Sequence, residues 1–299
     1  MTSSYIVRGF RPADTEQCLR LHAEAEREES GMLCLDFAGR LSRPGCSPGD
    51  DIFVAETAGE VIGCLEMFPE TGIGRVVLSC QVQPAHRRRG VSRQFLHRAE
   101  QRANELGVRS LQACVDAGDA LAKTALSRLG FRAVRRFLEM RTVLEKFRDT
   151  HTPGCQPMRP GEEAKLTRLQ NRSFAGSWGY HPNTLEQITY HFSAGEASPE
   201  DVILCCLGDK PAGYCWTMVF PNGKGAGRGR VFMMGVDPEH RGEGIGRRVL
   251  TAGLAHLKRK GIAEVDITVD SENEVAISLY RATGFEAKAS SLWYERLVD

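Results

Sequence analysis

A large net charge, a long apolar run and a signal sequence are all missing from this sequence. Its 39 basic and 38 acidic residues give a formal charge of +1, which argues against a chain-wide field for nucleic acid or anionic membranes. No apolar run approaches the roughly 20 residues of a membrane span, and the start MTSSYIVRGF lacks the regions of a signal peptide. We therefore expect a cytoplasmic protein without nucleic-acid or membrane partners, whose anion sites are local.

Metal-binding and disulfide patterns are also missing. The ten cysteines include no CxxC spacing, and several lie in apolar runs such as VILCCLG, where a free cysteine behaves as a small buried hydrophobe. The eight histidines show no paired ligand spacing. These absences predict no metal and favour a reducing compartment.

The sequence does contain an internal duplication. Its 299 residues are roughly twice a common single-domain length. The stretch VQPAHRRRGVSRQFL at 82–96 recurs as VDPEHRGEGIGRRVL at 236–250, 154 positions later. The residues of the first copy that keep this offset are Val82, Pro84, His86, Arg87, Gly90, Arg93, Leu96, Gly107, Val115, Asp116, Gly130 and Phe131.

The beginnings of the two copies match at a shorter offset. FRPADTEQCLRL from Phe10 aligns with MRPGEEAKLTRL from Met158, 148 positions later, so we expect six additional residues in loops of the second copy. The polar segment FRDTHTPGC at 147–155 has the composition of a linker. We predict two domains, at 1–148 and 155–299.

The periodicities of the second copy predict an α/β fold with a mixed sheet and helices on both faces. Asn183 is the expected cap of the second helix. The expected elements are a strand at 155–159, helices at 161–174 and 183–192, strands at 201–207, 211–220 and 230–236, a helix at 242–260, a strand at 261–270, a helix at 273–283 and closing strands at 285–298.

Three glycines surround the start of the helix predicted at 242–260. Without a Cβ at Gly242, Gly244 and Gly246, the backbone can approach a ligand, and the first N–H groups of the helix have no internal partner. Such a helix end binds anions, phosphate above all. The pattern R-x-x-G-x-G differs from the dinucleotide motif G-x-G-x-x-G and lacks the GK[ST] of phosphate-loop enzymes. Taken alone, such a glycine-opened helix is more often just a tight turn than an anion site.

Two motifs in order carry a family resemblance. VDPEHRGEGIG is followed some thirty residues later by N-x-x-A-x-x-x-Y-x-x-x-GF, at Asn273, Ala276, Tyr280, Gly284 and Phe285. This combination resembles the GNAT superfamily of acetyl-CoA-dependent N-acetyltransferases, and the duplication is similar to its tandem members such as mycothiol synthase. The resemblance covers most of the second half and, more loosely, the first. It implies two tandem GNAT-like domains.

The resemblance also implies roles for residues of the second copy. In this family the glycine loop binds the coenzyme A pyrophosphate, the preceding strand bonds the pantetheine arm, and a tyrosine protonates the departing thiolate. Tyr280 is the catalytic candidate, although an aromatic residue on an amphipathic helix is otherwise most often core. Ordinary pKa values of about 10 for tyrosine and 8.5 for a thiol favour a strong hydrogen bond over complete proton transfer. The cofactor-binding candidates are Met234, Gly235, Val236, Arg241, Gly242, Glu243, Gly244, Ile245, Gly246, Arg247 and Asn273.

The first copy departs from the family pattern. It has Leu126 at the tyrosine position, Asp119 at the asparagine position and Ser92 at that of the third glycine. We therefore place catalysis in the second domain. The first domain is expected to bind acetyl-CoA without turnover or to complete the substrate cleft; duplication for packing alone is the alternative. Its cofactor-binding candidates are Val82, Arg87, Arg88, Arg89, Gly90, Val91 and Ser92.

No residue stands out as the general base. Where the mycothiol synthase pattern has a glutamate and a substrate-contacting lysine, this chain has Arg230 and Met218, which counts against that substrate. Asp266, Asp270 and His181 are candidates acting through water, with surface solvation as the alternative. At pH 7, deprotonation costs roughly 4.6 kcal/mol for an amine of pKa 10.4 and roughly 1.4 kcal/mol for one of pKa 8. A low-pKa amine, such as an amino sugar or an α-amino group, is therefore favoured.

The sequence thus predicts an N-acetyltransferase that moves acetyl from acetyl-CoA to a primary amine of a small molecule by direct attack. A non-catalytic acyl-CoA-binding regulatory module and acetylation of a protein amine are the alternatives. The basic, glycine-rich segment 222–230 suggests nucleotide or RNA binding, but the neutral chain and the lack of interleaved aromatic residues disfavour it. Arg230 is expected either to bind an acidic substrate group or to be solvated.

Overall fold

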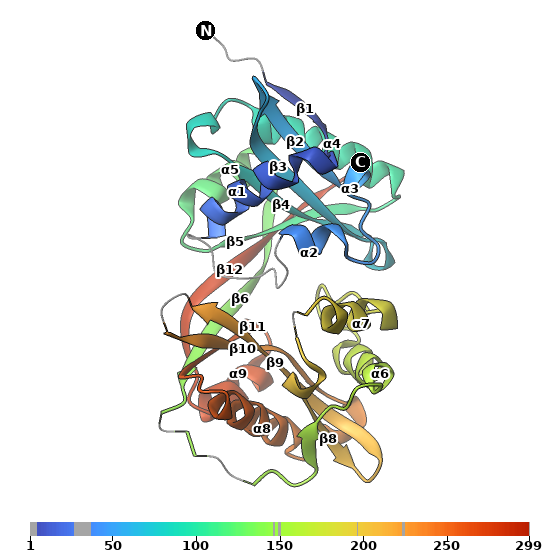
Figure 1. Cartoon of the computed structure of the whole chain (residues 1–299), viewed down its shortest axis with the longest axis vertical. Coiled ribbons are helices and arrows are strands. Elements are labelled where there is room, and N and C mark those ends of the chain that lie inside the picture. Colours follow the sequence, from blue (N-terminus) through green and yellow to red (C-terminus); the bar gives the residue numbers. More distant parts are fainter. Residues whose placement is uncertain are drawn as a thin grey trace. The chain divides into compact units, whose positions relative to one another are not determined.

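The computed structural model describes residues 5–26, 37–145, 147–148, 151–195, 197–222 and 225–298 (Figure 1). The chain forms two compact units: unit 1 is Met1–Arg135 with Ser291–Asp299, and unit 2 is Arg136–Ser290. Each unit is built on a mixed sheet with helices, so the predicted α/β class is confirmed. Within the described ranges, no helix is both long enough and apolar enough to cross a membrane.

Unit 1 has a sheet in the order β1-β2-β3-β4-β5-β12, in which β4 and β5 are parallel and the other neighbours antiparallel. One apolar cluster forms under α4 and another under α1 and α2, so helices cover both faces. The elements are β1 (Ile6–Gly9), η1 (Pro12–Asp14), α1 (Thr15–Glu26), α2 (Phe37–Leu41), α3 (Pro48–Asp51), β2 (Ile52–Thr57), β3 (Glu60–Glu70), η2 (Thr71–Ile73), β4 (Arg75–Val82), η3 (Pro84–His86), α4 (Val91–Glu105), β5 (Ser110–Asp116), α5 (Ala120–Arg128) and the end of β12 (Glu286–Leu297).

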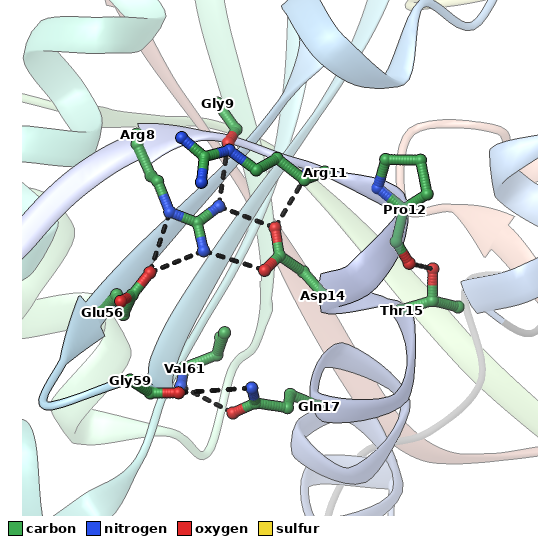
Figure 2. Close-up of polar contacts among 10 residues, drawn as sticks. All are labelled: Arg8, Gly9, Arg11, Pro12, Asp14, Thr15, Gln17, Glu56, Gly59 and Val61. Carbon is green, nitrogen blue, oxygen red and sulfur yellow. Dashed lines mark hydrogen bonds and ion pairs between the residues drawn. The ribbon is translucent and has the colours of Figure 1, made fainter.

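A charged network attaches α1 to the edge of this sheet (Figure 2). Arg8 on β1 donates to both carboxylate oxygens of Asp14, at 2.7 and 2.8 Å, and to Glu56 on β2, at 2.8 and 2.6 Å. Gln17 on α1 accepts a hydrogen bond from the backbone N–H of Val61 at 2.9 Å. The bonds from Arg8 hold the pKa of Asp14 below its usual range. The first helix is therefore positioned by charge pairing as well as by apolar packing.

Unit 2 repeats this arrangement, with the order β7-β8-β9-β10-β11-β6 and a parallel pair at β10 and β11. Its largest apolar cluster lies between α8, α9 and the sheet. The elements are β6 (Arg132–Val143), β7 (Cys155–Pro157), α6 (Glu163–Phe174), α7 (Leu185–Ser193), η4 (Pro199–Asp201), β8 (Val202–Leu207), β9 (Lys210–Asn222), β10 (Gly225–Val236), η5 (Pro238–His240), α8 (Ile245–Arg259), β11 (Glu264–Asp270) and α9 (Glu274–Ala282).

The closing strands are exchanged between the two copies. β6, which ends the first copy, pairs antiparallel with β11 from Phe137 opposite Asp270 to Val143 opposite Glu264. The C-terminal part of β12 pairs with β5 of the first copy. The compact units therefore divide after Arg135 and after Ser290 rather than within the linker predicted at 147–155. The repeat pattern could not reveal this, because β6 and β12 occupy the same position in their copies.

Several of the remaining elements keep the offsets read from the sequence. α4 and α8, β5 and β11, α5 and α9, and β6 and β12 all begin 154 residues apart, whereas α1 and α6 begin 148 apart. β2 and β8 begin 150 apart, so most of the additional residues lie between β8 and the end of β10. One of them is Phe232, because the register of β10 against β9 shifts between Val231 and Met233. β4 and β3 pair without such a shift.

Three local predictions are revised. Thr184, not Asn183, caps α7: its side chain accepts from the N–H of Gln187 at 3.1 Å. The extended backbone of Thr184 points its hydroxyl at the helix. Asn183 instead donates its backbone N–H to the side chain of Asn171 at 2.9 Å. The closing strands at 285–298 form the single strand β12, and Gly225 begins β10; residues 223–224 lie outside the described ranges.

Candidate functional site

The two parallel strands of unit 2 separate at their carboxyl ends. β10 pairs with β11 at Gly229, Arg230 and Val231, and this pairing stops where Phe232 forms the bulge. From Met233 to Val236, β10 still pairs with β9, while β11 continues its pairing with β6. One edge of β10 therefore presents backbone N–H and C=O groups that have no strand partner among the described residues. Such an edge suits an extended, amide-containing ligand.

The end of β10 leads directly to the start of α8. Gly244 is the N-cap, with φ of 75°, and Gly242 has φ of 84°; side chains rarely adopt either conformation. A Cβ at either position would meet no atom within 4 Å, so the space in front of the helix is open. Arg241 and Arg247 are exposed beside it. The helix begins at Ile245, three residues later than predicted, and its first N–H groups face this space.

A clamp from α6 holds this glycine loop. Arg172 donates to both carboxylate oxygens of Asp237, at 2.7 and 2.9 Å, and to Glu239 at 2.9 Å. Arg241 donates to the backbone carbonyl of Ser173 at 2.8 Å. Hydrogen bonding from Arg172 holds the pKa of Asp237 below its usual range. The sequence analysis missed this clamp, because its partners lie about 65 residues apart and share no motif.

The strand residues predicted to contact the cofactor have distinct surroundings. A Cβ at Gly235 would lie 2.6 Å from Ser173 and 2.9 Å from Tyr214, so only glycine allows α6 to pack this closely on β10. Met234 and Val236 face the opposite side and pack against the core under α8. Their side chains anchor the strand, and its unpaired backbone edge is what remains for a ligand.

Tyr280 lies on α9 with only 6% of its surface exposed. Its ring packs 5.9 Å from that of Phe285, whose backbone N–H donates to the carbonyl of Tyr280 at 3.0 Å. Burial raises the pKa of Tyr280 above its ordinary value, so the phenol stays protonated. Among the described residues the hydroxyl has no hydrogen-bond partner. The ring belongs to the core, as the alternative supposed, while the hydroxyl remains able to donate to a ligand.

Asn273 is the N-cap of α9. Its side chain accepts from the backbone N–H of Ala276 at 3.1 Å. Asp119 caps α5 of unit 1 in the same way, accepting from Leu121 and Ala122. The shared position is explained by helix capping, and the predicted contact of Asn273 with the cofactor stays a prediction.

The corresponding loop of unit 1 keeps the backbone form. Gly90 caps α4 with φ of 89°, followed by Val91 and Ser92 in the first turn. Arg88 adopts φ of 60°, which is uncommon for a residue other than glycine. Arg87 donates to the carbonyl of Val82 at 3.0 Å, which turns one of the three arginines of this loop back onto its own strand.

The space around the two loops differs. A Cβ at Gly90 would lie 3.2 Å from the hydroxyl of Tyr5, whereas none approaches the matching position at Gly244. At the position of Tyr280, unit 1 has Leu126, which packs against its core and brings no polar group. Unit 1 therefore has the helix start of the motif without the phenol, and a side chain stands beside its loop.

The structure weakens one candidate for the general base. Asp266 on β11 is buried and accepts two hydrogen bonds from Arg141, at 2.6 and 3.0 Å. The Nε atom of Arg228 lies 3.7 Å from Oδ2 of Asp266. Both carboxylate oxygens of Asp266 are therefore engaged by the guanidinium of Arg141. This places Asp266 to organise the strand edge between β11 and β6.

The other two candidates, Asp270 and His181, lie elsewhere in unit 2. Asp270 accepts from the backbone N–H of Glu272 at 3.0 Å, which shapes the turn before α9. His181 is half-buried in the segment between α6 and α7. Arg230 donates to the hydroxyl of Thr268 at 2.8 Å, so it bridges β10 and β11 just before they separate. This bond fixes the position of the Arg230 side chain. The sequence analysis, which expected a solvated side chain as one alternative, did not predict the bond.

An aromatic cluster that the sequence analysis missed lies at the bulge. Trp216 on β9, 1% exposed, stacks on Phe192 at 5.2 Å and meets Phe232 edge-on at 5.2 Å. The ring of His191 on α7 lies 5.5 Å from that of Trp216. The indole N–H of Trp216 has no hydrogen-bond partner among the described residues. This cluster covers the α7 side of the point where β10 leaves β11. The same ranges contain no group of side chains able to hold a metal ion.

Comparisons with known proteins reveal relatives over most of the chain. The profile described as "Acetyltransferase (GNAT) family" matches residues 15–131 and 164–285. A mycothiol acetyltransferase of Geodermatophilus obscurus is 30% identical over 272 residues, which cover 86% of this chain and 85% of that protein. A mycothiol acetyltransferase of Thermobispora bispora is 31% identical over a match that covers 95% of this chain and 97% of that protein.

Solved structures share the fold at lower identity. A GCN5-related N-acetyltransferase from Sphaerobacter thermophilus superposes with a TM-score of 0.73 at 21% identity, covering 98% of this chain and 96% of its own. A tandem GNAT protein from the clavulanic acid biosynthesis pathway superposes with a TM-score of 0.71 at 18% identity. The match covers 99% of this chain and 98% of that protein. The duplicated architecture therefore occurs in other proteins over essentially their whole length.

Proposed function

The chain belongs to the GNAT acetyltransferase family, and we propose that it transfers the acetyl group of acetyl-CoA to a primary amine of a small molecule. The observation that carries this proposal is Tyr280, a buried and protonated phenol whose hydroxyl has no partner among the described residues. Relatives named mycothiol acetyltransferase support a small-molecule acceptor.

The acetyl-CoA site that we propose runs along the carboxyl end of β10 and onto α8. The unpaired edge from Phe232 to Val236 would bond the amide-containing arm of the donor, and the N–H groups that follow Gly244 would bind its pyrophosphate. The clamp formed by Arg172 keeps this loop in place before the ligand arrives. Unit 2 is accordingly the catalytic unit in this proposal.

Direct attack accounts for the chemistry with these groups. The unprotonated amine nitrogen bonds to the thioester carbon, the carbon–sulfur bond breaks, and the thiolate leaves with a hydrogen bond from Tyr280. The proton that the nitrogen loses on forming the amide ends on the thiolate or in the solvent. Because Arg141 holds the buried Asp266, we propose that the low pKa of the acceptor amine, rather than a protein base, supplies much of the unprotonated nitrogen that attacks.

We propose that unit 1 binds acetyl-CoA without turning it over. Leu126 at the tyrosine position and Tyr5 beside Gly90 support the absence of turnover there. A non-catalytic acyl-CoA-binding module and acetylation of a protein amine remain the competing proposals. The partnerless Tyr280 hydroxyl favours an enzyme over the first of them.

Release of free thiol from acetyl-CoA, measured with a panel of amines, tests the proposed function. We expect turnover with a subset of amino sugars or α-amino compounds, and an N-acetyl product for each by mass spectrometry. Binding of acetyl-CoA without thiol release for any amine would support the non-catalytic module. Turnover confined to peptides with lysine side chains would replace the proposed acceptor by a protein amine.

A further inference from the structure

Two cysteines face each other at the outer edge of unit 2. Cys155 on β7 is directly opposite Cys205 on β8, and both are free thiols. The backbone N–H of Cys206 donates to the carbonyl of Gly154 at 2.8 Å, and that of Met158 donates to Val202 at 2.7 Å. These bonds flank the cysteine pair, which is therefore a non-hydrogen-bonded pair. In such pairs the Cα atoms are about 4.5 Å apart, within the range that a disulfide spans.

The two sulfurs already interact. The thiol of Cys155 is hydrogen-bonded to the sulfur of Cys205, which lowers the pKa of Cys205 to about 7. The positive charge of Arg248 on α8 acts in the same direction. Its guanidinium donates to the carbonyl of Pro153, beside the pair. A thiolate shared by two sulfurs and stabilised by a cation is the reactive form in thiol–disulfide exchange.

The two sulfurs differ in accessibility. Cys205 is fully buried in the core under α8, whereas Cys155 is partly exposed at the edge of the sheet. A reagent from the solvent therefore reaches the sulfur of Cys155 first, and the sulfur of Cys205 is then next to it. An outer attacking thiol with an adjacent resolving thiol is the arrangement that closes an intramolecular disulfide.

We propose that Cys155 and Cys205 form a thiol-modification site that is oxidised reversibly to a disulfide by exchange with a low-molecular-weight disulfide. The Cys155 sulfur attacks one sulfur of the reagent while its proton passes to the Cys205 thiolate, so that a mixed disulfide forms and one reagent thiolate leaves. Cys205 then loses that proton, attacks the Cys155 sulfur and expels the second thiolate. Two protein thiols and one disulfide give one protein disulfide and two thiols, with the two released protons taken up by the leaving thiolates or the solvent.

Cys206 provides a matched control. It follows Cys205 in the same strand, and the charged groups that act on it include Glu162 and Lys165 near α6, on the face away from Arg248. Cys206→Ser should therefore remove one thiol of similar exposure without affecting the exchange. This variant leaves unchanged the residues that we propose to bind acetyl-CoA and the acceptor amine.

The test uses the full chain, incubated with mixtures of reduced and oxidised glutathione, then alkylated and mapped by mass spectrometry. We expect the loss of two free thiols, a linked pair of peptides containing Cys155 and Cys205, and full reversal by dithiothreitol. Cys155→Ser should abolish the linkage, and Cys206→Ser should retain it. Loss of thiols without this linkage, or an unchanged loss of two thiols in Cys155→Ser, would overturn the proposal.

Thermal unfolding supplies a second readout. A disulfide between these positions closes a loop of about fifty residues, so the oxidised protein should melt at least about 5 °C higher than the reduced one. Cys155→Ser, which changes a partly exposed side chain, should fold and show no such rise. An equal rise in Cys155→Ser under oxidising conditions would also contradict the assigned pair.

Discussion

Tyr280 joins a packed ring to a hydroxyl that has no hydrogen-bond partner among the described residues, and this combination separates a catalytic role from a structural one. Tyr280→Phe keeps the ring and its contact with Phe285. We expect kcat to fall by roughly 10²-fold or more, because the leaving thiolate loses its donor, while affinity for acetyl-CoA changes little. Steady-state kinetics together with calorimetry measure both.

Leu126→Tyr in unit 1 is the matched control for this substitution. It restores the tyrosine of the motif in the copy that lacks it, and we expect no measurable gain in turnover. An unchanged kcat in Tyr280→Phe, with the protein folded, would remove Tyr280 from the mechanism and return it to the core.

The pH dependence of catalysis distinguishes the acceptor amine from an enzyme base. Burial raises the pKa of Tyr280, so this residue should cause no inflection in the neutral range. kcat/KM should therefore rise along the titration of the free amine and differ between two amines. At pH 7, amines of pKa near 8 should outperform lysine-like amines on the order of 10²-fold. A common inflection for both amines would instead reveal a protein base and direct attention to Asp270 and His181.

Asp14 links residue chemistry to the stability of unit 1. Its folded pKa lies below that of the unfolded chain, about 3.9, because Arg8 donates to it. The interaction therefore stabilises the fold above that pH and is lost as pH falls through the folded pKa. Asp14→Asn should destabilise α1 by roughly 2 kcal/mol at pH 7, and by less near pH 3, in hydrogen exchange.

Glu16→Gln, two residues further on in α1, is the comparison. Glu16 pairs with Arg20 on the surface, with 82% of its side chain exposed, so its loss should have no measurable effect. A destabilisation by Asp14→Asn that is equal at both pH values would show that packing, not charge, causes it.

At the scale of elements, the start of α8 is the feature on which donor binding depends in our proposal. Gly244 has a positive φ and open space before it, so Gly244→Asp adds both backbone strain and a negative charge where a pyrophosphate would bind. We expect most acetyl-CoA binding to be lost in calorimetry, with the fold retained by circular dichroism. Unchanged affinity in a folded variant would disprove this placement.

Gly90→Asp makes the same change at the start of α4 in unit 1. Its added side chain meets the hydroxyl of Tyr5, so the substitution tests a similar strain in the copy without the tyrosine of the motif. Turnover should fall much less than in Gly244→Asp. An equal loss in both variants would show that catalysis is not confined to unit 2.

At the scale of the whole molecule, the exchanged strands make each unit depend on both copies of the sequence. Deleting residues 291–299 removes the part of β12 that pairs with β5. We expect the amides of β5 that face β12 to lose protection from hydrogen exchange, because that ladder partner is gone, while those of β11 keep theirs through β6. Loss of protection in β11 with β5 unaffected would contradict this division of the chain.

Much of the proposed site could be predicted from the sequence because its signals are local. The glycine loop, the helix that follows it and the position of Tyr280 lie within about fifty consecutive residues and recur at a constant offset. Backbone geometry requires glycine at positions such as 244 whatever surrounds them, so the pattern shows directly in the residue types.

Tertiary structure alone decided the rest, because those features join segments that no local pattern connects. The repeat could not tell which copy supplies the closing strand of each sheet, since β6 and β12 occupy the same position in their copies. Arg172 reaches Asp237, and Cys155 faces Cys205, only through the packing of distant elements. The sequence by itself determined the duplication, the glycine loop and the tyrosine; the pairing of distant segments determined what holds them and which thiols meet, because long-range contacts depend on packing in three dimensions.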